Sequence, residues 1–158
     1  MYLLDTNVIS ENRKGQRANP GVQTFFQRVI SNRDKLFLSV VTVGELRRGI
    51  ELIRHRNDHV QATQLEQWLE QILTDYQDNI IGVDADTAQL WGRLRVPHHE
   101  HELDKLIAAS ALLYDLTVVT RNVDDFAGTG VKLLNPFADC TSDHIVSGTG
   151  CCRDANPK

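Results

Sequence analysis

Five short apolar runs, separated by longer amphipathic segments, constrain the fold of this chain more than any other feature of its sequence. The runs lie at 2–4, 36–41, 80–83, 117–120 and 131–134. They are rich in Leu, Ile, Val and Phe and lack a regular polar alternation, which is typical of strands buried on both faces. The sequence therefore predicts a largely parallel sheet.

The segments between the runs carry apolar residues at helical spacing. Within 20–30, for example, Val22, Phe25 and Val29 fall on one stripe of a helix. The same pattern occurs at 43–54, 61–76, 85–94 and 105–114. Strands that alternate with helices indicate an α/β fold in which helices cover both faces of the sheet.

The domain organisation follows from the length of the chain and from the composition of its last residues. A chain of 158 residues is enough for one domain with a substantial core and is short for two. Asn135 and Pro136 mark the expected end of the packed domain, with Phe137 as a last anchor. Residues 138–158 are rich in Ser, Thr, Gly and Asp and offer little to bury. We therefore expect one domain at 1–137 and a flexible tail at 138–158.

The sequence has the features of a cytoplasmic protein. No apolar run approaches the ~18–20 residues that cross a bilayer. Residues 1–5 lack the basic start and the long apolar stretch of a secretory signal. The cysteines, Cys140, Cys151 and Cys152, are odd in number and confined to one end, which makes a poor disulfide framework. We expect a cytoplasmic location.

The net charge of −4 argues against a broadly basic surface that binds nucleic acid without specificity. It does not exclude a nuclease, because a metal ion can supply the positive charge that meets a phosphate group. A basic stretch near Glu45 contains Arg47, Arg48, Arg54 and Arg56. Pairing with Glu51 and surface solvation is the favoured interpretation of this stretch. Contact with an RNA backbone or with an acidic partner segment is the alternative.

Four carboxylates stand near the ends of predicted elements. Asp5, Glu45 and Asp125 each come soon after an apolar run, and Asp104 opens the helix predicted at 105–114. In an open parallel sheet the carboxyl ends of the strands meet at one edge, where ligands bind. We therefore expect these four side chains to lie at one rim of the sheet.

Each of these acids also has a structural interpretation. Asp5 and Asp104 can cap helices, and Asp125 can be a solvated loop residue. Thr42 and Glu45 have the spacing of a capping box, which for Glu45 alone is the better interpretation. Several carboxylates at one rim would, however, repel each other unless cations bound them. Because oxygen ligands select hard ions, the four acids together predict a site for Mg²⁺ or Mn²⁺.

Four short motifs, in their order along the chain, resemble a known family. The motifs are Leu3-Leu4-Asp5-Thr6-Asn7-Val8, Thr42-Val43-Gly44-Glu45-Leu46, Leu103-Asp104-Lys105-Leu106-Ile107-Ala108-Ala109 and Val119-Thr120-Arg121-Asn122-Val123-Asp124-Asp125-Phe126. From Met1 to about Phe137 the chain is similar to the PIN-domain toxins of the VapC type, and within that group to the FitB-like branch. The resemblance does not extend to the tail.

The resemblance implies a three-layer α/β/α domain that cleaves RNA with Mg²⁺ or Mn²⁺, as the toxin of a type II toxin–antitoxin pair. It carries catalysis and metal binding to Asp5, Glu45, Asp104 and Asp125. It carries a supporting role, orienting the ligands, the attacking water or the phosphate, to Thr6, Asn7, Thr120 and Asn122. It also implies a small antitoxin protein that blocks the site and often binds DNA, and a homodimer formed through the helices.

Two other functions fit parts of the sequence. Phosphatases of the haloacid-dehalogenase type also begin with a strand and an aspartate, but they need a second acid two residues on, where this chain has Asn7. A module without catalysis, which binds RNA or regulates transcription with its antitoxin, is the alternative to an enzyme. Substitution of Asp5 and Asp104 separates these interpretations, because only a metal-dependent nuclease loses RNA cleavage.

Three histidines, His98, His99 and His101, cluster before the helix predicted at 105–114. A structural zinc site would need cysteines or a regular ligand spacing, and neither accompanies them. We therefore expect no metal role for this cluster.

Overall fold

The computed structural model describes residues 1–138 and the backbone of 146–147. Its strands are β1 (Tyr2–Leu4), β2 (Leu36–Ser39), β3 (Ile80–Ile81), β4 (Thr117–Val119), β5 (Lys132–Leu134) and β6 (Val146–Ser147). Its α-helices are α1 (Thr6–Asn12), α2 (Pro20–Asn32), α3 (Val40–His55), α4 (His59–Asp75), α5 (Ala85–Leu94) and α6 (Glu102–Leu113). Short 3-10 helices are η1 (Gly15–Arg17), η2 (Gln77–Asn79) and η3 (Val123–Phe126). Strands and helices alternate as the apolar pattern predicts.

The strands form one sheet in the order β3-β2-β1-β4-β5-β6. Every neighbouring pair from β3 to β5 is parallel, and only β6 runs antiparallel to β5. Leu4, at the end of the central strand β1, pairs in register with Leu38 of β2 and Val119 of β4. The mostly parallel sheet is therefore confirmed, and the carboxyl ends of β1, β2 and β4 meet at one edge.

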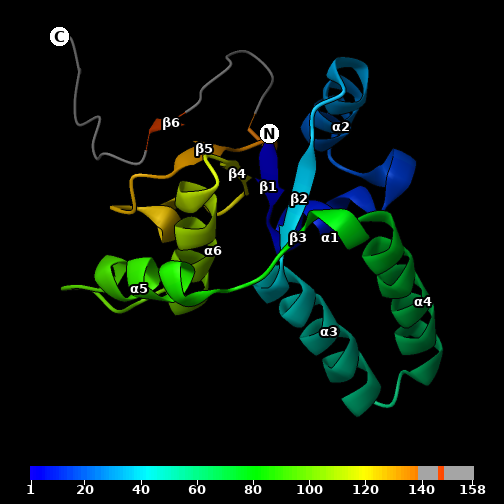
Figure 1. Cartoon of the computed structure of the whole chain (residues 1–158). Coiled ribbons are helices and arrows are strands. Elements are labelled where there is room, and N and C mark those ends of the chain that lie inside the picture. Colours follow the sequence, from blue (N-terminus) through cyan, green and yellow to red (C-terminus); the bar gives the residue numbers. More distant parts are fainter. Residues whose placement is uncertain (139–145, 148–158) are drawn as a thin grey trace, which may run out of the picture.

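The sheet separates two apolar cores. Leu3 and Leu4 are both fully buried, but they point to opposite faces because side chains alternate along a strand. Leu4 packs with residues of α1 to α4, including Phe25 and Leu69, whereas Leu3 packs with Ile107 of α6. Figure 1 shows α5 and α6 on one side of the sheet and α1, α2, α3 and α4 on the other. The three-layer α/β/α architecture is thus confirmed.

The boundary between β2 and α3 differs from the sequence prediction. The predicted strand 36–41 ends at Ser39, whose side chain accepts a hydrogen bond from the Val41 amide at 3.1 Å and caps α3. Thr42 therefore lies inside the helix, where its hydroxyl donates to the Leu4 carbonyl at 3.4 Å. The predicted capping box of Thr42 and Glu45 is wrong, because a polar residue closer to the strand caps the helix first.

The start of α6 also differs from the prediction. The helix begins at Glu102 instead of 105, and its N-cap residue is His101 in the left-handed conformation, with φ of 54°. Asp104 therefore stands in the first turn and is not the cap. A carboxylate in this turn still interacts favourably with the positive end of the helix dipole.

The sequence patterns did not indicate α1 as a helix. Its N-cap is Asp5, whose carboxylate accepts a hydrogen bond from the Thr6 amide at 2.7 Å, and its buried residues are Val8 and Ile9. With only 7 residues, α1 is too short to show the repeated apolar spacing that identified the other helices. The helix places Thr6 and Asn7 directly beside the end of β1.

The structure covers the predictions about the C-terminal tail and about membrane-spanning segments only in part. The predicted tail, 138–158, with Cys140, Cys151 and Cys152, lies outside the described residues except for Ala138 and the backbone of β6. Within the described part of the chain, no helix has the length and apolar character needed to cross a membrane.

Candidate active site

The four predicted acids come together at the carboxyl edge of the sheet. Asp5 follows β1 and caps α1, Glu45 lies on α3, Asp104 lies in the first turn of α6, and Asp125 lies on η3 after β4. Their charges act on one another, since Asp5, Asp125 and Glu45 each raise the pKa of Asp104. These four residues are called the acidic cluster below. The prediction that they share one rim is confirmed.

Asp5 is the most buried member of the acidic cluster, with 4% of its surface exposed. Besides the Thr6 amide, its carboxylate accepts hydrogen bonds from Asn7 Nδ2 at 2.7 Å and from Thr120 Oγ1 at 2.6 Å. Burial raises the pKa of Asp5, and these hydrogen bonds act against that rise. The carboxylate is therefore held in one orientation by donors that favour its charged form.

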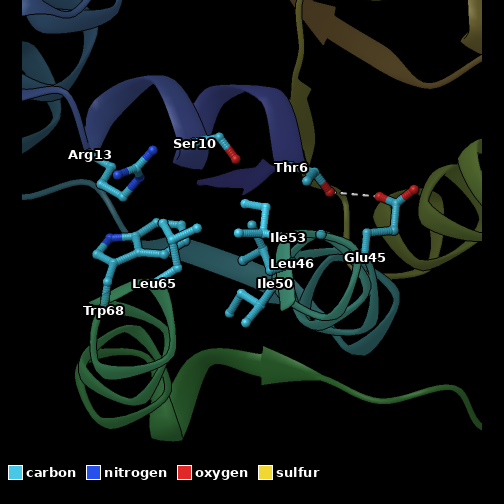
Figure 2. A pocket seen from close by; sticks show the side chains of 10 residues that line it. Thr6, Ser10, Arg13, Glu45, Leu46, Ile50, Ile53, Leu65 and Trp68 are labelled. Carbon is cyan, nitrogen blue, oxygen red and sulfur yellow. Dashed lines mark hydrogen bonds between the residues drawn. The ribbon is translucent and has the colours of Figure 1, made fainter. Parts of the chain in front are cut away.

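Glu45 is oriented by a single contact from another element. Thr6 Oγ1 donates to Glu45 Oε2 at 2.6 Å (Figure 2), which links the first residue of α1 to the second turn of α3. Since the Thr6 amide also donates to Asp5, one residue fixes two carboxylates at once.

Asp104 is the member of the acidic cluster whose pKa is most clearly raised. Partial burial is the largest cause that raises its pKa, to about 6. The negative charges of Asp5, Asp125 and Glu45 add to the rise, in that order, and His101 opposes it. At neutral pH the ionised side chain is therefore held among like charges, an arrangement that a bound cation would relieve.

Asp125 faces a histidine that the sequence analysis set aside. His101 Nδ1 lies 3.2 Å from Asp125 Oδ1. One ligand atom from each of His101, Asp104 and Asp125 lies within 4.8 Å of the others. The expectation that no histidine near residue 100 has a metal role is thus challenged for His101, although His98 and His99 are not part of this group. The three-residue spacing of His101 and Asp104 at a helix start was the available signal.

The supporting residues form one hydrogen-bonded network behind Asp5. Asn7 Nδ2 also donates to Thr120 Oγ1 at 3.1 Å, and Asn7 Oδ1 accepts from the Arg121 amide at 3.0 Å. Asn122 contributes its backbone amide, which donates to Thr120 Oγ1 at 3.0 Å. Asn7 therefore occupies the second position after Asp5 as an orienting amide, where a phosphatase of the alternative class would need an acid.

An apolar groove extends from the acidic cluster between α1, α3 and α4. Its lining residues are Thr6, Ser10, Arg13, Glu45, Leu46, Gly49, Ile50, Ile53, Leu65 and Trp68. Figure 2 shows Glu45 and Thr6 at one end and Trp68 with Arg13 at the other. The Arg13 guanidinium lies 5.6 Å from the centre of the Trp68 ring, within the range of a cation–π contact. The groove thus joins one carboxylate of the acidic cluster, Glu45, to an apolar surface.

The acidic cluster has the chemistry of a divalent-cation site. Its members are carboxylates, the ligands that hard ions prefer, and they come from four separate elements held by packing and hydrogen bonds. The raised pKa of Asp104, to which Asp5, Asp125 and Glu45 each contribute, shows that the negative charges act on one another. A bound cation would relieve this repulsion.

Comparison with known proteins identifies the fold. Residues 2–132 match the PIN domain family. The chain belongs to the PIN-domain family. It is 34% identical to toxin FitB of Neisseria gonorrhoeae over 145 residues, which is 88% of this chain and 100% of that protein. It is 27% identical to VapC ribonuclease Y4jK of Sinorhizobium fredii, covering 87% of this chain and 98% of that protein.

A solved structure of a FitAB complex bound to an IR36 DNA fragment gives the same result. It superimposes on this PIN domain with a TM-score of 0.76 and 30% identity, covering 91% of this chain and 100% of the matched chain. The resemblance to VapC-type and FitB-like PIN domains is therefore confirmed, and the helices and strands described above are those of the family.

Proposed function

We propose that this PIN-domain protein is a metal-dependent endoribonuclease and the toxin of a type II toxin–antitoxin pair. The observation that carries the proposal is the convergence of Asp5, Glu45, Asp104 and Asp125 at one sheet edge, in a chain that matches a named toxin over its full length. A related VapC protein carries the name ribonuclease. The reaction is hydrolysis of a phosphodiester, in which water bonds to phosphorus as the bond to one nucleotide oxygen breaks.

The proposed cofactor is Mg²⁺ or Mn²⁺, held by the acidic cluster. When bound, such an ion lowers the pKa of water and stabilises charge on phosphate oxygens. The chain's own residues position the ligands: Thr120 and Asn7 hold Asp5, and Thr6 holds Glu45. Asn122 supports Thr120 through its backbone amide. Thr6, Asn7, Thr120 and Asn122 therefore act as positioning residues in this proposal.

The proposed partners are an RNA substrate, a small antitoxin that binds DNA, and a second copy of this chain, all in the cytoplasm. The solved FitAB complex on DNA supports an antitoxin of this kind. The groove that leads from Glu45 to Trp68 offers an apolar surface beside the acids. A partner segment that covered this groove would block the site.

The direct test is to incubate the purified, partner-free protein with total RNA and Mg²⁺ or Mn²⁺ and to map the new RNA ends. We expect cleavage that a chelator stops and that Asp5→Asn and Asp104→Asn abolish. Asp124→Asn is the matched control, because Asp124 is exposed and lies next to Asp125 without belonging to the acidic cluster. Cleavage that survives both site substitutions would contradict a nuclease and favour the non-catalytic, RNA-binding or regulatory role.

A further inference from the structure

His101 is a potential metal ligand outside the four carboxylates that lies against the acidic cluster. Its Nδ1 faces Asp125 Oδ1 at 3.2 Å, and Asp104 completes a group whose ligand atoms lie within 4.8 Å of one another. Three ligand atoms at these separations can contact a single ion. The group therefore offers an ion one nitrogen ligand and two oxygen ligands.

The backbone around His101 is fixed from both sides. The His101 carbonyl accepts the Lys105 amide at 2.9 Å, which starts α6. The buried Lys105 ammonium donates to the His98 carbonyl, and Trp91 Nε1 donates to the Glu102 carbonyl at 2.9 Å. These contacts hold the backbone of the segment that precedes α6, so an ion bound through His101 would not have to order a free loop.

We propose that His101 is a further ligand of the ion held by Asp104 and Asp125, and that its nitrogen makes this site prefer Mn²⁺ to Mg²⁺. The inference rests on the proposed function, since it assumes that the acidic cluster binds the ion. It differs from that function in naming a ligand outside the four acids and a choice between the two ions.

The separation of the two facing atoms agrees with this role. Two ligand atoms at right angles on an ion, each about 2.1 Å away, lie about 3.0 Å apart. The 3.2 Å between His101 Nδ1 and Asp125 Oδ1 is close to that value. Mg²⁺ is a hard ion that favours oxygen and water, whereas imidazole is a better ligand for transition ions. A nitrogen ligand therefore raises affinity for Mn²⁺ more than for Mg²⁺.

The test uses Mn²⁺ itself as the probe on the full chain. Pulsed electron paramagnetic resonance detects a nitrogen nucleus bound directly to Mn²⁺, and ¹⁵N-labelled histidine identifies it as imidazole. His101→Asn removes the imidazole at a position where Asn tolerates the left-handed backbone. His98→Asn is the control, because His98 belongs to the same segment and its side chain is 80% exposed.

The expected result is an imidazole nitrogen signal in the wild type and in His98→Asn, and its loss in His101→Asn. The ratio of Mn²⁺ to Mg²⁺ affinity, measured by calorimetry, should fall on the order of tenfold in His101→Asn only. A wild-type Mn²⁺ complex without an imidazole nitrogen signal overturns the proposal, and this measurement needs no variant to fold. An unchanged signal in His101→Asn overturns it equally.

Different results contradict the proposed nuclease function and the proposed His101 ligand. If Asp104→Asn abolishes cleavage while Mn²⁺ shows no bound imidazole, the proposed function stands and His101 is a neighbour of Asp125 without a role as a metal ligand. If cleavage survives Asp5→Asn and Asp104→Asn, the proposed function itself is wrong, whatever the nitrogen signal shows.

Discussion

Two clusters of charged side chains on this protein differ in how their charges are balanced. Between α3 and α4, Arg47 and Arg54 both form ion pairs with Glu66 and with Glu51; these four residues are called the ion-pair cluster. At the sheet edge, the acidic cluster gathers four carboxylates. The hydrogen bond from Arg47 is the largest cause that lowers the pKa of Glu66, whereas burial and like charges raise the pKa of Asp104.

This comparison separates charges that are paired within the protein from charges that the proposed cation would balance. The ion-pair cluster is complete within the chain, which agrees with the favoured sequence interpretation of the arginine stretch as helix-surface pairing. Such partly exposed pairs contribute little to stability. In the acidic cluster, burial and the neighbouring carboxylates raise the pKa of Asp104. The proposed cation would relieve this repulsion.

The largest expected effect separates the two clusters by activity. Glu45→Gln should lower RNA cleavage by at least about a hundredfold, because it removes a carboxylate from the proposed metal site. Glu66→Gln, the same substitution in the ion-pair cluster, should leave cleavage unchanged. Initial rates on one RNA substrate measure both. Equal losses in the two variants would contradict the assignment of Glu45 to the site.

Metal addition should stabilise the protein through one cluster only. An ion at a hundred times its Kd adds about 2.7 kcal/mol to the free energy of unfolding. In a domain of this size that corresponds to roughly 5–10 °C in Tm. Thermal unfolding with and without Mn²⁺ should show this shift in the wild type and in Glu66→Gln, and a much smaller one in Asp104→Asn. A full shift in Asp104→Asn would place the ion elsewhere.

Without metal, Asp104→Asn should make the protein more stable. A carboxyl with a folded pKa of about 6, above its usual value of 3.8, stabilises the fold below pH 3.8 and loses that contribution as pH rises through 6. At pH 7 the substitution should therefore raise the unfolding free energy by about 1 kcal/mol, after allowance for partial exposure. Tm in chelator should rise by about 2–4 °C at pH 7.

The pH dependence of that difference is its control. The Tm advantage of Asp104→Asn over the wild type should shrink as the pH falls from 7 toward 4, since the wild-type carboxyl then takes up its proton. Asp124→Asn, at an exposed position, should show no comparable advantage at either pH. An advantage that persists unchanged at pH 4 would show that charge is not its cause.

The smallest expected effect concerns the ion-pair cluster alone. Glu66→Gln should lower Tm by less than Asp104→Asn raises it, because exposed ion pairs are offset by solvation and side-chain entropy. The decrease should become smaller in high salt, which screens the remaining attraction. Unfolding curves at two ionic strengths measure it. A salt-independent decrease would indicate lost packing instead of lost charge.

Much of the fold was predictable because it depends on local pattern. The helix at Ala85–Leu94 was predicted to the residue, and the apolar runs were each placed on a strand. The boundaries near the site were less predictable. Ser39 ends β2 and caps α3, so the capping role expected of Thr42 was wrong. His101 is the N-cap residue of α6, where Asp104 was the candidate cap from sequence. Competing caps cannot be ranked from sequence, because the choice depends on where the strand stops.

The candidate site was predicted by residue type and order, while its contacts were not. The motifs around Asp5 and Asp125 indicated a family and a set of acids. Nothing in them indicated that Thr6 would hold Glu45 from another element, or that Asn122 would act through its amide. The contacts of Thr6 with Glu45 and of Thr120 with Asp5 join residues that are 39 and 115 positions apart in the chain.

The sequence by itself determined the alternation of strands and helices, the family and the identity of the four acids. Each of these depends on residue types at short spacing along the chain. Only the tertiary structure decided how burial and the other three acids raise the pKa of Asp104, and that His101 lies beside Asp125. Electrostatic energy depends on distance through space and on burial. Both are set by how β1, β4, α3, α6 and η3 pack, and a linear pattern of residues carries neither quantity.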